Sequence, residues 1–292
     1  MLIEFKIKRD FGQVINDTFT FMRQNFKPLI KTYFLFCGLF VLAGMLSMLT
    51  QQYKMVNIVN SIGNGRNVNR FGMGSVYGLE YFLSIAFSLA SYASMTVAIL
   101  SYITLYVQKG RQVPGMDEVW AYFKYYFFRV FFSSIGLILL LVIAFVFCLL
   151  PGFYLFPFVA MTFPIMVMEN GSLSYSFSRS FKLVKDNFWI TVGTLLVMWI
   201  IVYACMSLII LPTTLISMIG MFSGSTPHMS LALTMVSTVL QSLCQIFTII
   251  PIITISLIYF SLLEKKESTG LMERIANFGD QEKPVDERPE EY

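Results

Sequence analysis

Residues 130–168 read VFFSSIGLILLLVIAFVFCLLPGFYLFPFVAMTFPIMVM, an apolar run that contains no charged residue. A helix that crosses a bilayer needs about 20 apolar residues, so this run is long enough for two crossings, or for one crossing and a re-entrant loop. Pro151 and Gly152 divide it near the middle and predict a tight turn there. How often this run crosses the membrane decides the side on which everything after it lies.

The composition of the whole chain places it in the membrane. Only 13% of the 292 residues are charged and 56% are hydrophobic, whereas soluble domains carry about 25% charged residues. So few charges cannot cover the surface of a soluble globule, and so much apolar surface excludes a disordered chain. We therefore predict an all-α integral membrane bundle, one domain over residues 1–278, with spans at residues 32–50, 79–107, 130–150, 153–168, 188–211 and 230–263. We expect the fourth span to kink at Pro157 and Pro164, and the fifth to stop near Pro212.

The distribution of basic residues selects six crossings. The segments outside the spans hold, in chain order, six, three, four, none, three, none and five Lys or Arg residues. Six helices with the N-terminus inside put 18 cations inside and three outside, whereas five helices leave 10 inside and 11 outside. Because inner loops carry the excess of Lys and Arg, we predict six helices in the cytoplasmic membrane with both ends cytoplasmic.

Three of the predicted cytoplasmic segments resemble one another. Each places apolar and aromatic residues at helical spacing, ends in a basic residue three positions before a Phe, and then enters a span; the three are residues 11–26, 116–127 and 173–188. Asp10 with Gln13, and Ser172, are candidate caps. We predict three amphipathic helices that lie in the headgroup region, or that pack on one another as a cytoplasmic cap.

Several short motifs resemble bacterial proteins related to the glycerophosphoryl diester phosphodiesterase membrane domain, over roughly residues 11–275. They are GQVINDTFTFMRQNF at 12–26, LPG at 150–152, FP at 163–164, MENG at 168–171, SRSFKLVKDNFW at 178–189 and YFSLLEKKESTGL at 259–271, the last with Glu264 where Arg is usual. The resemblance implies a six-helix membrane fold. Some relatives add a soluble phosphodiesterase domain, but the segments outside the spans are too short here to form one, so no enzyme activity is carried over.

One polar group at the start of the third repeat suggests a function. It comprises Glu169, Arg179, Ser180, Lys182, Lys185 and Trp189. The cations share one helical edge beside Trp189, which suggests a site for an anionic lipid headgroup. The alternative is ordinary positive-inside charge, with Arg179 paired to Glu169.

Other features predict structure rather than chemistry. Small residues recur every fourth position in the second span and predict a helix-packing face: Ala86, Ala90, Ser94 and Ala98. His228 is the single histidine, and we expect neither a catalytic site, a metal nor a cofactor. We expect membrane lipids or another membrane protein as partners, and no nucleic acid. The acidic residues of 279–292 predict a disordered cytoplasmic tail. The sequence thus favours a lipid- or partner-binding membrane protein, with a transporter or lipid-translocating protein as the alternative.

Overall fold

A computed structural model describes residues 3–63, 78–147, 149–222, 230–268 and 272. The described chain is helical, and six of its helical stretches are long and apolar enough to cross a membrane, which confirms the all-α class and the number of candidate spans. The elements are α1 (Phe11–Gln24), α2 (Phe26–Gly63), α4 (Leu79–Gln108), α5 (Met116–Phe147), α6 (Leu149–Met168), α7 (Leu173–Val184), η2 (Lys185–Asn187), α8 (Phe188–Phe222), α9 (Leu231–Cys244), η3 (Gln245–Thr248) and α10 (Ile249–Glu267).

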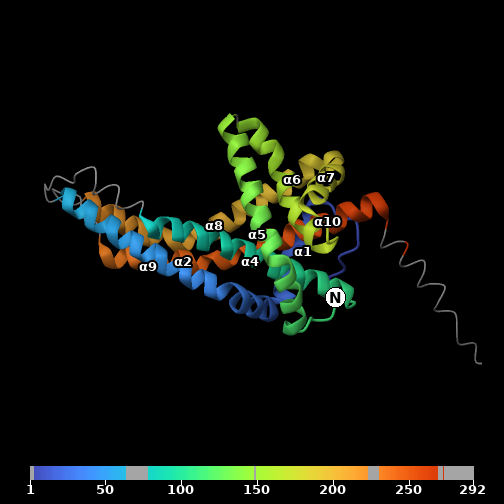
Figure 1. The fold of residues 1–292 in the computed structure, drawn as a ribbon, viewed down its shortest axis with the longest axis horizontal. Coiled ribbons are helices and arrows are strands. Elements are labelled where there is room, and N and C mark those ends of the chain that lie inside the picture. Colours follow the sequence, from blue (N-terminus) through green and yellow to red (C-terminus); the bar gives the residue numbers. More distant parts are fainter. Residues whose placement is uncertain (1–2, 64–77, 148, 223–229, 269–271, 273–292) are drawn as a thin grey trace, which may run out of the picture.

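The long helices form an arm from which a hairpin projects (Figure 1). Helices α2, α4, α8 and α9 run along the arm, where α2 packs on α4 and α9, and α8 packs on α9. Helices α5 and α6 pack on each other and point away from the arm. Helix α10 is buried along almost its whole length, between α1, α4, α6 and α8. It is the central element that the shorter helices α1 and α7 cover.

The turn predicted at Pro151 and Gly152 is not at these residues. Pro151 and Gly152 are both helical, inside the first turn of α6, which begins at Leu149. The first four N–H groups of a helix have no partner within it, so proline is tolerated there. Gly152 faces the ring of Phe145, where an added Cβ would lie 2.5 Å from Phe145 Cδ1. Gly152, in the first turn of α6, therefore leaves room for the ring of Phe145 near the end of α5. A kink at Pro157 or Pro164 stays a prediction.

Several helices extend beyond the predicted spans. Helix α8 passes Pro212 and continues to Phe222, so the predicted stop near residue 211 is wrong. Proline removes one backbone hydrogen bond, which neighbouring hydroxyl groups can offset in an apolar helix. Here the nearby hydroxyls of Thr213 and Thr214 donate to the carbonyls of Ile210 and Leu211 at 2.7 and 2.9 Å, whereas the carbonyl that loses its donor is that of Leu208, four residues before Pro212. The last span is interrupted instead, because the 3₁₀ turn η3 separates α9 from α10.

The three repeated segments do not form three separate short helices. Helices α1 and α7 are separate, and both predicted caps are present: Asp10 and Gln13 form a reciprocal capping box, and Ser172 accepts from the N–H of Tyr175. Residues 116–127 are instead the first turns of the continuous helix α5. Helix α1 packs mainly on α10, and α7 mainly on α6. Both therefore cover spanning helices with their apolar faces.

Some sequence predictions fall outside the described residues. They are His228 and the acidic tail of 279–292.

Candidate functional site

Four segments that the charge distribution assigns to one side meet at one end of the molecule, called here the terminal end. The ion pair between Arg111 and Glu4 spans 3.2 Å and joins the loop after α4 to the N-terminal segment. Arg129 donates to Asn170 at 3.0 Å, which joins α5 to the α6–α7 turn. The end of α10 reaches η2 through Lys265 and Lys266, which contact Asn187 and Asp186 at 2.5 and 2.8 Å.

Glu169 is the centre of the predicted polar group. Its two carboxylate oxygens accept from the hydroxyls of Tyr175 and Tyr259, each at 2.9 Å. The guanidinium of Arg179 lies 3.5 Å from the same carboxylate and also pairs with Glu267 at the end of α10. The pairing of Arg179 with Glu169 is thus present, and it belongs to a cluster that ties α6, α7 and α10 together. We call Glu169, Tyr175, Arg179, Tyr259 and Glu267 the Glu169 cluster.

The α6–α7 turn places these side chains. Asn170 has a φ of 51°, in the left-handed region that Asn tolerates better than most residues. Gly171 follows, and a Cβ there would lie 2.5 Å from Tyr175 Cδ1 and 2.7 Å from Ser176 Oγ. The missing side chain at residue 171 therefore lets Tyr175 reach Glu169.

The remaining predicted site residues do not join the Glu169 cluster. Ser180 is buried, and its hydroxyl donates to the carbonyl of Phe177 on its own helix at 2.7 Å. Lys182 and Lys185 are exposed, and neither ammonium forms an ion pair with a described residue. The side chain of Trp189 is 81% exposed. The structure therefore divides the predicted group into an internal ion-pair cluster and an exposed lysine–tryptophan surface, defined by Lys182, Lys185 and Trp189.

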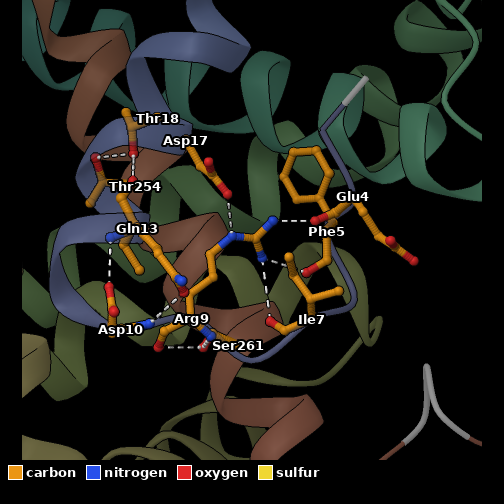
Figure 2. A network of polar contacts seen from close by, with 11 residues as sticks. Glu4, Phe5, Ile7, Arg9, Asp10, Gln13, Asp17, Thr18, Thr254 and Ser261 are labelled. Atoms are coloured by element: carbon orange, nitrogen blue, oxygen red, sulfur yellow. Dashed lines mark hydrogen bonds and ion pairs between the residues drawn. The ribbon is translucent and has the colours of Figure 1, made fainter. Parts of the chain in front are cut away.

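Sequence reasoning missed an arginine at this end whose side chain is fully buried, Arg9. Figure 2 shows its guanidinium enclosed by the N-terminal segment and α1. Nε donates to Asp17 at 2.8 Å, Nη1 donates to the carbonyl of Phe5 at 2.8 Å, and Nη2 contacts the carbonyl of Glu4. Its side chain has no exposed surface. Burial lowers the pKa of Arg9, while the carboxylate of Asp17 works to raise it.

The N-terminal segment is also tied to α10. The backbone N–H of Arg9 donates to the hydroxyl of Ser261 at 2.9 Å. The hydroxyls of Thr18 and Thr254 lie 3.3 Å apart between α1 and α10 (Figure 2). The sequence offered two signals: an acidic residue eight positions after Arg9, and the apolar residues Ile3 and Phe5 alternating with charged ones. Neither reveals that the arginine is enclosed.

The structure places the four residues of the predicted packing face of α4 in different surroundings. Ala90, Ser94 and Ala98 are buried, and Ser94 donates to the carbonyl of Phe36 on α2 at 2.8 Å. Ala86 is exposed. A series spaced by four residues drifts by about 40° per step around a helix of 3.6 residues per turn. The first member therefore rotates away from the face that the later members share.

This arrangement holds helices together and exposes the cations of the lysine–tryptophan surface. Among the described residues, no cluster of His, Cys, Asp or Glu could hold a metal ion. Comparisons with protein-family models, with curated proteins and with solved structures found no match.

Proposed function

We propose that this chain is a multi-pass membrane protein without catalytic activity that binds anionic lipid headgroups, or an acidic partner in the membrane, through the lysine–tryptophan surface. The observation that carries the proposal is the contrast in pairing at the terminal end. Arg179 is committed to two carboxylates, whereas Lys182 and Lys185 face outward beside an exposed indole. Cations near an anionic bilayer surface attract its phosphates, and tryptophan prefers the headgroup depth.

The same reasoning sets the orientation that we propose. The terminal end gathers the segments with the excess of Lys and Arg, so we place it, with both chain ends, on the cytoplasmic side of the cytoplasmic membrane. Helices α1 and α7 then lie at the interface, with their apolar faces on the spanning helices and their basic residues toward phosphates.

Lipid retention tests the proposal. The double variant Lys182→Ala/Lys185→Ala should bind phosphatidylglycerol on the order of tenfold more weakly, with little change for phosphatidylcholine, as measured by native mass spectrometry of the purified protein. The matched control is Lys54→Ala/Lys109→Ala, which removes the same charge from lysines already paired with Glu80 and Glu118. Unchanged phosphatidylglycerol binding in the first variant, or an equal loss in the control, would contradict the proposal.

The second candidate function is transport or lipid translocation. What favours it is a partly polar cavity between α2, α4, α8 and α9, since substrate sites of transporters lie inside the bilayer, where polar groups are otherwise rare.

A further inference from the structure

The arm contains a cavity of about 230 Å³. Residues of α2, α4, α8 and α9 line it, together with Gln245 of the η3 turn that follows α9. Gly44, halfway along α2, and Ser91, in the middle third of α4, both line it. Both helices are candidate membrane spans. The cavity therefore lies at the depth of the apolar part of the bilayer rather than at the terminal end.

The wall of this cavity is partly polar. Phenylalanine and methionine side chains form much of it, and the polar members are Ser88, Ser91, Gln241, Ser242 and Gln245. None of the described residues that line it is charged. Two carboxamides and three hydroxyls thus line one open pocket of an otherwise apolar arm, where Ser91 and Ser242 are buried and Ser88 and Gln241 are exposed.

Several of these groups have no partner within the protein. Ser91 is 2% exposed, and its hydroxyl makes no hydrogen bond. The side-chain amides of Gln241 and Gln245 likewise form no hydrogen bond with a described residue. A carboxamide offers two donor hydrogens and an acceptor oxygen, and leaving such groups unsatisfied in an apolar medium costs several kcal/mol. The buried hydroxyl of Ser91 therefore lacks a partner that an occupant of the cavity can supply.

The backbone changes at the same place. Helix α9 ends at Cys244, and the 3₁₀ turn η3 begins at Gln245, where the hydroxyl of Thr248 donates to the carbonyl of Gln245 at 2.6 Å. Interrupted spanning helices place polar groups at mid-membrane depth, which is where membrane proteins bind polar ligands.

We propose that this cavity binds a small uncharged molecule that carries hydroxyl or amide groups, and that water fills it otherwise. The carboxamides can donate and accept at once, which suits such a molecule. An ion would meet no opposite charge there, so its desolvation would not be offset. The volume is below the about 300–1,000 Å³ of typical drug-sized pockets, so the occupant is small. The proposal does not depend on headgroup binding at the lysine–tryptophan surface.

Cysteine reactivity tests whether polar molecules enter. In a variant whose four native cysteines are replaced by alanine, Ser91→Cys is compared with Ser101→Cys, using uncharged methyl methanethiosulfonate. Ser101 is the matched control because it lies on the same helix and is also buried with an unpartnered hydroxyl, but does not line the cavity. Only the thiolate reacts, and an apolar setting suppresses it, so Ser91→Cys should react on the order of tenfold faster. Equal rates would overturn the proposal.

Competition tests the class of ligand. Glycerol and urea at high concentration should slow the reaction of Ser91→Cys, and Gln241→Leu/Gln245→Leu should abolish this protection. An anionic or cationic methanethiosulfonate should react far more slowly than the uncharged reagent. No protection by either solute, or equal reaction with the charged reagents, would overturn binding of an uncharged polar molecule. Ser88→Cys, which also lines the cavity, provides a second site should Ser91→Cys fail to fold.

Discussion

Two arginines fasten short segments to the same central helix, α10, in different environments. Arg9 has no exposed side-chain surface, and its guanidinium donates to Asp17 and to backbone carbonyls of the N-terminal segment. Arg179 keeps 24% of its side chain exposed and pairs with Glu169 and Glu267. Arg9 holds the backbone of the N-terminal segment, which packs on α10, whereas Arg179 joins side chains of separate helices.

The difference teaches which charges the fold depends on. When either a buried guanidinium or its partners are removed, the groups that remain are left unpaired away from water. A half-exposed ion pair can exchange its partners for water at little cost. Both arginines carry the same charge, so burial and partner type, rather than sequence identity, set their contributions.

The largest expected effect comes from removing Arg9. Arg9→Met should lower the free energy of unfolding by about 3–5 kcal/mol, because the carbonyl of Phe5 and the carboxylate of Asp17, whose side chain is 25% exposed, lose a donor that is itself fully buried. Arg179→Met should lower it by only about 1–2 kcal/mol, since water reaches its partners. Chemical or thermal unfolding of the purified protein in detergent measures both.

Arg23→Met is the control for this ranking, because Arg23 is exposed near the end of α1. It should leave the unfolding transition nearly unchanged. Should Arg179→Met prove as destabilising as Arg9→Met, the distinction between the two environments would be wrong.

A smaller loss should follow from crowding the α6–α7 turn. Gly171→Ala places a Cβ 2.5 Å from Tyr175 Cδ1, so the ring must move away from Glu169. Overpacking of this kind costs about 1–3 kcal/mol, and the same unfolding measurement detects it. Gly38→Ala is the matched control, because nothing lies within 4 Å of a Cβ there and alanine is favoured over glycine within helices. Equal destabilisation by the two variants would show that the contact with Tyr175 does not matter.

The smallest effect belongs to the threonine pair between α1 and α10. Each hydroxyl also donates to a carbonyl of its own helix, Thr18 at 2.7 Å and Thr254 at 2.9 Å. A double-mutant cycle with Thr18→Val and Thr254→Val should therefore give a coupling energy of about 0.6 kcal/mol, typical of hydroxyl pairs between membrane helices. A coupling near that of a buried ion pair would mean that these hydroxyls, rather than Arg9, hold α1 in place.

The helical class, the six candidate spans and the two helix caps were predictable, because each depends on neighbouring residues. The helix ends were not. Pro151 indicated a turn and Pro212 a stop, yet both lie inside helices, the first in an opening turn, where the N–H groups have no partner within the helix. On α4, Ala90, Ser94 and Ala98 are buried and Ala86 is exposed.

Of the Glu169 cluster, only Glu169 and Arg179 were among the predicted site residues. Glu169 and Arg179 are close in sequence, so their pairing could be proposed from spacing alone. Glu267, Tyr259 and Ser261 come from a helix about 90 to 250 residues away from their partners, and no local pattern indicates them.

Apolar run lengths and the placement of cations by themselves determined that this chain has six candidate spans, because transfer into lipid depends on composition over about 20 residues. Only the tertiary structure decided that Arg9 is enclosed, that Lys182 and Lys185 stay free of ion pairs with described residues, and that Ser91, Gln241 and Gln245 share one cavity. Those outcomes depend on which distant surfaces meet, since contact between helices sets the burial and the partners of each polar group.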